Sequence, residues 1–216
     1  MDDNKLSDPP HPDLAVLRSR SYLPHWERDD AAYFVTFRLA DALPQQVLLH
    51  YQAEREALLV RAQIKGQPLS IEEKDHLELL VSRRIQRYLD TGMGACHLAT
   101  PDVAEVVKHA LGHFDGIRYR LFAWCIMPNH VHVVVQPLAP YTLSEILHSW
   151  KSFTANRVQR LFGFQGAFWQ REYYDHLIRN EGVFWRIIKY VKENPAKVNL
   201  QDWQWVYVCI PEEFAL

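Results

Sequence analysis

Residues 127–136 read Met-Pro-Asn-His-Val-His-Val-Val-Val-Gln, and they are the most informative part of the sequence. Its valine-rich half predicts a strand, in which successive side chains point to opposite faces of a sheet. The alternate valines would bury one face, so the imidazoles of His130 and His132 point together from the other face. Two neighbouring imidazoles make half of a metal site. The alternative is that the two histidines pack in the core and bind no ligand.

Residues 119–126 predict a strand that precedes the histidines. Only Met127, Pro128 and Asn129 separate the two strands, so we expect an antiparallel hairpin with both histidines beside its turn. An earlier strand is expected at residues 32–39, where side chains alternate between two faces.

A long helical insertion is expected between the first and second strands, at about residues 44–115. Residues 45–63 are rich in helix formers, and Ser70 with Glu73 forms a capping box for a second helix. Thr100 caps a third helix. Three roles are open for the insertion: it recognises DNA, covers the site or mediates assembly.

Two helices are expected after the hairpin. Thr142 and Glu145 form a capping box, followed by apolar residues at helical spacing as far as Gly163. The last helix, about residues 182–194, has a buried stripe and should end before Pro195.

The row beside that stripe consists of Arg186, Tyr190 and Asn194, which are four residues apart. If this helix overhangs the histidine strand, a phenol, an amide oxygen and a guanidinium converge on the two imidazoles. The alternative is that Tyr190 packs at the helix flank and Asn194 only caps the helix.

These elements predict an α+β fold with a central antiparallel sheet and packed helices. We expect an irregular leader at residues 1–30, one domain at residues 31–200 and a C-terminal strand or tail at residues 201–216.

Composition excludes several classes of protein. The 216 residues are 48% hydrophobic, which suffices for a substantial core, and no apolar run is long enough to span a bilayer. The N-terminus lacks the pattern of a signal peptide, so we expect a cytoplasmic protein. Three scattered cysteines indicate neither a disulfide framework nor a zinc knuckle.

Charge is unevenly distributed along the chain. The formal net charge is −2, yet nine Lys or Arg face five Asp or Glu between Glu145 and Lys197. A local basic surface on a mildly acidic protein suits a polyanion held in one position. Ordinary solvated helix faces are the alternative reading.

Four blocks together resemble a known family: residues 122–135 (Phe-Ala-Trp-Cys-Ile-Met-Pro-Asn-His-Val-His-Val-Val-Val), 150–154 (Trp-Lys-Ser-Phe-Thr), 168–179 (Phe-Trp-Gln-Arg-Glu-Tyr-Tyr-Asp-His-Leu-Ile-Arg) and 190–197 (Tyr-Val-Lys-Glu-Asn-Pro-Ala-Lys). They are similar to the REP-associated tyrosine transposases, within the HUH superfamily of single-strand nucleases. The blocks stand in the family order, and residues 22–39 resemble its opening strand.

The resemblance implies a ferredoxin-like HUH fold and specific roles for four residues. His130 and His132 match the metal ligands, Tyr190 matches the nucleophile and Asn194 matches the polar third ligand. It implies cleavage and strand transfer of single-stranded DNA at a REP-like hairpin repeat, through a 5′-phosphotyrosine, by a nucleoid-associated monomer or homodimer. The long insertion, the Asn ligand and the acidic charge depart from the simplest members.

Chemistry from the residues fits this implication. A phenol with a pKa near 10 is a weak nucleophile, so a divalent cation that polarises the phosphate addresses the main obstacle. Imidazoles with an amide oxygen and open positions favour Mg²⁺ or Mn²⁺, whereas nitrogens alone would tolerate Zn²⁺.

Candidate DNA contacts follow from charge and aromatic character. For Trp169, packing in the core is an equal alternative to base stacking. Tyr173 and Tyr174, near His176, are rival nucleophiles that we rank below Tyr190. The candidate contacts are Lys151, Arg157, Arg160, Trp169, Arg171, Arg179, Arg186 and Lys189.

Three functions are therefore compared. The first is a single-tyrosine DNA nuclease and strand transferase, the second a repeat-binding protein without cleavage, and the third a zinc-dependent hydrolase of small molecules. The third is disfavoured because no glutamate base lies near the histidine pair in the sequence.

Overall fold

The structure is a computed structural model that describes residues 31–44 and 84–210, the backbone of two strands at residues 16–20 and 23–27, and single helical positions between residues 46 and 60. Residues 84–90 are helical, as expected for the end of the insertion's second helix. The capping box predicted at Ser70 and Glu73 lies outside the described residues.

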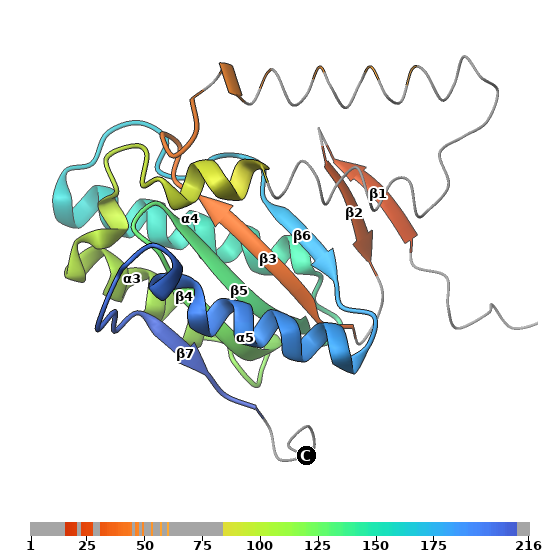
Figure 1. Ribbon diagram of the computed structural model, residues 1–216. Coiled ribbons are helices and arrows are strands. Elements are labelled where there is room, and N and C mark those ends of the chain that lie inside the picture. The colour runs from red at the N-terminus through yellow and green to blue at the C-terminus, as the bar shows by residue number, and fades with distance from the viewer. Residues whose placement is uncertain are drawn as a thin grey trace, which may run out of the picture.

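A five-stranded antiparallel sheet forms the centre of the molecule (Figure 1). In spatial order, the strands are β6 (Tyr174–Leu177), β3 (Tyr33–Arg38), β5 (His130–Pro137), β4 (Tyr119–Ile126) and β7 (Val206–Val208). The strand β3 pairs with β6 on one side and β5 on the other, and β6 and β7 are the two edges of the sheet.

The histidine hairpin is confirmed. The backbone N–H of Met127 donates to the carbonyl of His130 at 2.8 Å, which closes the turn between β4 and β5. On the other side of β5, His132 lies opposite Thr36 and His130 lies opposite Arg38 of β3. The expected alternation therefore places these four side chains on one face.

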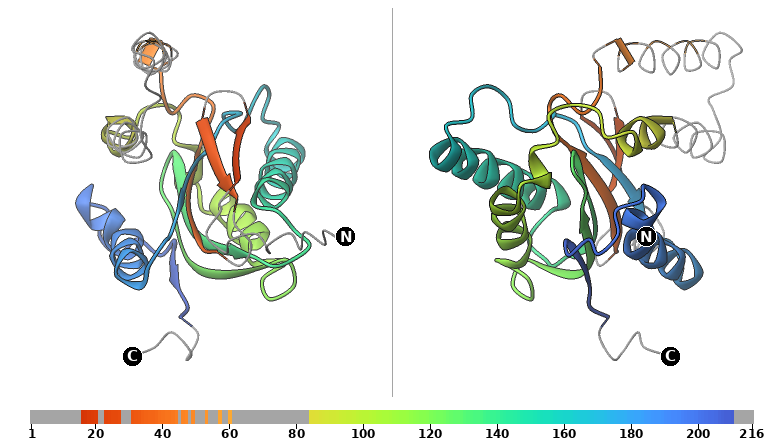
Figure 2. Two further views of the ribbon diagram at one scale, coloured as in Figure 1. Left: turned by 90° about the vertical axis from the view of Figure 1, so that its right-hand side faces the viewer. Right: turned by 60° about the vertical axis from the view of Figure 1, so that its left-hand side comes forward.

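Helices cover both faces of the sheet. The helices α3 (Pro101–Gly112) and α4 (Leu143–Phe162) pack with the alternate valines of β5 in one core cluster. The helix α5 (Glu181–Lys197) packs on the other face, in a second cluster. Figure 2 shows α5 on the opposite side of the sheet from α4. The predicted α+β class is confirmed, and the histidines share their face with α5.

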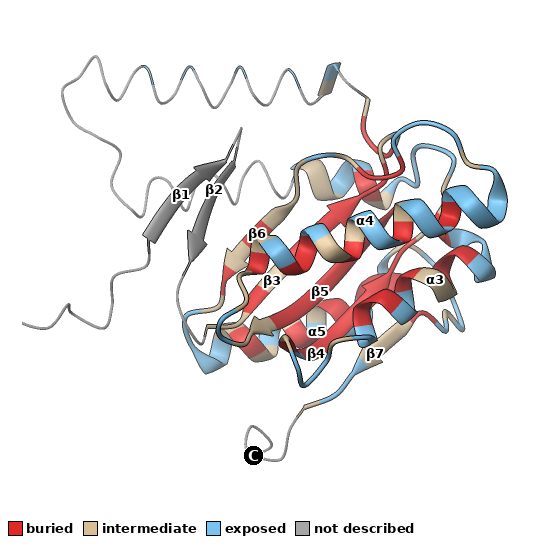
Figure 3. Cartoon of the chain, turned by 180° about the vertical axis from the view of Figure 1, so that it is seen from behind, coloured by how far each residue is buried: buried red, intermediate tan, exposed pale blue. Residues whose placement is uncertain are grey.

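Burial follows these layers. The central strands are buried along most of their length, while the outer faces of α4 and α5 are exposed (Figure 3). A short 3₁₀ helix, η1 (His97–Ala99), precedes α3 and buries Leu98. None of the described helices has the length and apolar character that a bilayer span requires.

Two helix ends agree with the sequence only in part. The capping box of Thr142 and Glu145 is present, and Gly163 ends α4 at a φ of 65°. Thr100 precedes α3 as predicted, but its side chain makes no capping hydrogen bond. The helix is begun instead by Pro101, whose fixed φ suits the first turn.

The prediction that Pro195 ends the last helix is wrong. The helix α5 continues to Lys197 with Pro195 inside its final turn. Proline there removes only one backbone bond, and both Asn194 and Pro195 are buried, so packing offsets the loss.

The expectation of an irregular leader is also wrong for residues 16–27. The strands β1 (Val16–Arg20) and β2 (Leu23–Glu27) form an antiparallel pair, with Ser19 opposite Pro24. Proline is tolerated at the edge of a two-stranded sheet, so the proline-rich composition did not exclude strands.

Candidate active site

The two histidines form the centre of the site. Both rings are 0% exposed, and the Nε2 atoms of His130 and His132 face each other at 3.1 Å. The rings meet at 77°, so neither stacks on the other. Two ring nitrogens at this separation can share one hydrogen or one ligand.

The other nitrogen of each ring is held by a neighbour. Nδ1 of His130 lies 2.7 Å from Oδ1 of Asn129, and Nδ1 of His132 lies 2.7 Å from Oγ1 of Thr36. The Asn129 Nδ2 atom donates to the carbonyls of Leu89 and Met93. This fixes Asn129 Oδ1 as the acceptor, so His130 carries its hydrogen on Nδ1 and directs the Nε2 lone pair toward His132.

Burial keeps both rings neutral. It lowers the pKa of His130 to about 3, with a further contribution from the charge of Arg38. It lowers the pKa of His132 well below the usual 6.5, helped by His130 and Lys197. Neutral imidazole is the form that binds a metal.

Tyr190 of α5 lies against this pair. Its ring centroid is 5.4 Å from that of His132 and 5.8 Å from that of Phe34. The Nζ atom of Lys197 stands 3.9 Å from the phenol ring centroid. Burial raises the pKa of Tyr190, and the nearby charge of Asp90 raises it further, whereas hydrogen bonding with Asn194 lowers it. The phenol is therefore protonated at neutral pH.

Asn194 lies one turn beyond Tyr190 on α5. Its side chain is 1% exposed, and its Oδ1 atom has no hydrogen-bond partner among the described residues. A buried amide oxygen without a partner is costly and is explained by an additional ligand at the site. Arg186, at the start of the same row, is exposed and does not share this burial.

These residues fit a divalent cation. Two ligands that stand at right angles about 2.1 Å from an octahedral ion are about 3.0 Å apart, close to the separation of the two Nε2 atoms. The amide oxygen of Asn194 has a free acceptor position. No group of three His, Cys, Asp or Glu side chains that could hold a metal occurs within the described part of the chain, so an amide is needed to complete the ligand set.

The predicted DNA contacts divide between the two faces. Arg157 and Arg160 are exposed on α4, across the sheet from the histidines. Arg186 and Lys189 are exposed on α5, on the histidine side. Arg171 and Arg179 are exposed before and after β6, respectively.

Among the predicted contacts, Trp169 and Lys151 form hydrogen bonds inside the fold. Trp169 is 7% exposed, donates from Nε1 to Thr154 at 2.8 Å and packs 4.8 Å from the Phe37 ring, which favours packing over base stacking. Lys151 donates from Nζ to the carbonyls of Gln170 and Arg171, at 2.7 Å each.

The rival tyrosines lie on opposite faces. Tyr174 is on the histidine face, with its ring 6.4 Å from that of Phe34 and its backbone opposite Thr36. Tyr173 packs against the core cluster beneath α3 and α4. His176 lies opposite Phe34 in the ladder. Tyr174 is thus the rival that a test must include.

Sequence reasoning missed five neighbours of the site. Thr36 could have been found from its place on the polar side of the first strand, and Asn129 from its position beside His130. Gln86 and Asp90 of the insertion and Lys197 in the last turn of α5 gave no comparable signal, because only tertiary packing brings them to the histidines.

Comparison with known proteins agrees with this geometry. Residues 97–194, which include both histidines, Tyr190 and Asn194, match the family described as "Transposase IS200 like". The matched residues make up a little under half of the chain. The transposase resemblance drawn from the sequence is thereby confirmed.

Two solved structures are similar to this chain at low sequence identity. One is described as a REP-associated tyrosine transposase bound to a REP hairpin: it is 16% identical, with 88% of this chain and 80% of that chain covered and a TM-score of 0.47. The other is a putative transposase from Deinococcus radiodurans, 14% identical, with 82% and 95% covered and a TM-score of 0.38. Comparison with curated proteins finds no match.

Proposed function

We propose that this protein is a transposase that cuts and rejoins single-stranded DNA through a covalent bond between Tyr190 and the 5′ phosphate. The observation that carries the proposal is the contact between the phenol ring and His132, whose Nε2 atom faces that of His130. A nucleophile beside a two-imidazole half-site suits attack on a phosphodiester.

In the proposed reaction, the Tyr190 oxygen loses its proton and forms a bond to phosphorus. The bond from phosphorus to the 3′ oxygen breaks, and that oxygen takes up a proton to become a free 3′-hydroxyl. One phosphoester replaces another, so a later attack by a 3′-hydroxyl can reverse the step without ATP.

His130, His132 and Asn194 would hold Mg²⁺ or Mn²⁺ in this proposal. The ion supplies charge stabilisation to the phosphoryl oxygens when bound. Asn129 and Thr36 orient the imidazoles, as outer partners of metal ligands commonly do. Lys197, over the phenol ring, favours the charged phenolate as the proton leaves.

A hairpin of REP type is the proposed substrate, on the strength of the four sequence blocks that resemble REP-associated transposases. The exposed cations on the histidine side, Arg186 and Lys189, are proposed to contact its phosphates.

The test is covalent capture. The protein is incubated with Mn²⁺ and a labelled pool of single-stranded oligonucleotides that carry a hairpin and randomised flanks, and is then denatured. We expect a labelled protein–DNA adduct, with a phosphotyrosine at position 190 found by mass spectrometry. Tyr190→Phe should abolish the adduct while DNA binding persists.

Tyr174→Phe is the matched control, because Tyr174 lies on the same sheet face and has the same chemistry. Its adduct yield should equal that of the unaltered protein. Loss of the adduct in Tyr174→Phe, and not in Tyr190→Phe, would reassign the nucleophile. Binding without any adduct would favour the second candidate, a DNA-binding protein that does not cleave.

A further inference from the structure

The helical segment at residues 84–90 is the end of the insertion's second helix and lies beside the histidine pair. Nε2 of Gln86 is 3.4 Å from Nε2 of His130 and donates to Oδ1 of Asp90 at 2.6 Å. Gln86 and Asp90 are four residues apart, so both project from one side of this helix. Both side chains are half-buried.

Asn129 ties this segment to the histidine strand. Its Nδ2 atom donates to the carbonyl of Leu89 at 3.2 Å, while its Oδ1 atom accepts from His130. The same residue therefore fixes the ring of His130 and the end of the helix that carries Asp90. The position of Asp90 relative to the site is set by the fold and not by a loose surface contact.

Charge balance shows what this carboxylate can do. Two neutral imidazoles and one amide bring no negative charge to a divalent cation. The positive charge of Arg38 lowers the pKa of His130, and that of Lys197 lowers the pKa of His132. The negative charge of Glu172 raises the pKa of Arg38. The charge of Asp90 raises the pKa of Tyr190, and the charge of Lys197 lowers the pKa of Asp90. Asp90 therefore lies close to the charged and titratable groups of the site.

We infer that Asp90, held by Gln86, lies outside the ligand set of the cation and supplies, through Gln86, the negative charge that the imidazoles and the amide lack. Gln86 is the positioning residue: its amide nitrogen holds the carboxylate beside His130. The segment at residues 84–90 thus lies against the site and adds a negative charge beside it. This inference rests on the proposed function, because it concerns the same cation.

Direct measurement of Mn²⁺ binding to the full chain, by calorimetry or by loss of the free-ion electron paramagnetic resonance signal, tests the inference. Asp90→Asn keeps the shape and removes the charge, so we expect a loss of affinity of about 10- to 100-fold, the range typical of groups that support a metal site. Asp90→Glu keeps the charge and should remain within about threefold of the unaltered protein.

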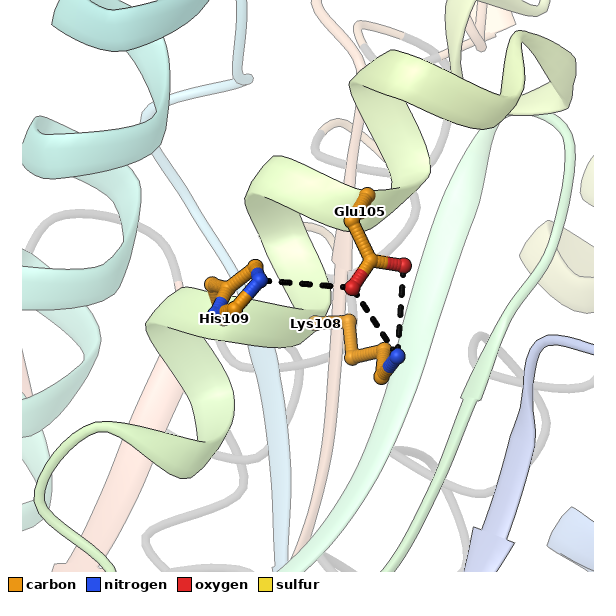
Figure 4. Close-up of polar contacts among 3 residues, drawn as sticks. All are labelled: Glu105, Lys108 and His109. Carbon is orange, nitrogen blue, oxygen red and sulfur yellow. Dashed lines mark hydrogen bonds and ion pairs between the residues drawn. The ribbon is translucent and has the colours of Figure 1, made fainter.

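Glu105→Gln is the matched control. Glu105 lies half-buried on α3, where it accepts from Lys108 at 2.9 Å and lies 3.3 Å from Nε2 of His109 (Figure 4). Its removal should leave Mn²⁺ affinity unchanged. Equal affinities in Asp90→Asn and Glu105→Gln would overturn the inference, and so would an equal loss in Asp90→Asn and Asp90→Glu.

Folding and site occupancy are checked separately. Burial raises the pKa of Asp90, so Asp90→Asn should unfold at the same temperature or higher without metal. His130→Gln should abolish the measured Mn²⁺ binding, which assigns the signal to this site. If the unaltered protein binds Mn²⁺ and forms the Tyr190 adduct while Asp90→Asn binds Mn²⁺ equally well, only the role of Asp90 fails. If the unaltered protein forms no adduct, the proposed function fails.

Discussion

At the scale of single residues, Thr36 gives a direct test of how the site is oriented. Its hydroxyl holds Nδ1 of His132 at 2.7 Å, and Thr36→Val removes that partner with little change in volume. We expect Mn²⁺ affinity to fall by about tenfold, because outer partners fix the direction of the ligating nitrogen. Calorimetric titration measures it. Thr154→Val, a buried threonine on the other face, should leave affinity unaltered; an equal loss in both would refute the role of Thr36.

Lys151 offers a pH test at the same scale. Burial lowers its pKa from 10.5 to about 8, so between pH 8 and 10.5 the unfolded chain binds a proton that the folded chain does not. Stability contributed by this group therefore rises with pH across that window. We expect the free energy of unfolding, measured with urea from pH 8 to 10, to rise less in Lys151→Met than in the unaltered protein. Identical slopes would contradict the burial of a charged amine.

At the scale of elements, the two threonines that precede α4 and α3 should differ in their contribution to stability. Thr142 accepts from the backbone N–H of Glu145, whereas Thr100 makes no such bond. Thr142→Ala should lower the free energy of unfolding by about 1 kcal/mol, and Thr100→Ala by much less. Urea denaturation of the two variants measures the difference. Equal losses would show that sequence position, and not the capping bond, sets the cost.

The same scale shows where sequence reasoning succeeds and where it stops. The β4–β5 hairpin and α4 could be predicted because the spacing of apolar residues within each segment indicates its type, and turn or capping residues mark where it begins and ends. The strand β6 has only four residues, three of them titratable, and forms because β3 offers it an edge. Likewise, Tyr190 and Asn194 could be paired from one helix, but Gln86 reaches His130 across 44 positions of sequence. No local pattern encodes such a contact.

At the scale of the whole molecule, the sheet separates two kinds of surface. One face is covered by α3 and α4 over an apolar core, and the other carries the histidines beneath α5 and the helical segment at residues 84–90. The basic segment identified in the sequence is divided by the same sheet. The side of the sheet on which a cation lies therefore decides whether it can contact DNA held at the site. The sequence does not give that side until the pairing of the strands is known.

This division predicts different salt dependences for similar substitutions. Arg186→Gln and Lys189→Gln, on the histidine side, should weaken binding of single-stranded hairpin DNA and reduce the slope of log K against log salt concentration by about 0.7 for each lost phosphate contact. Arg157→Gln and Arg160→Gln, on α4, should leave both quantities close to those of the unaltered protein. Fluorescence anisotropy at several salt concentrations measures affinity and slope together. If the α4 variants lose the larger share of affinity, then DNA binds across the sheet from Tyr190, and the phenol could not reach the phosphate that it is proposed to attack.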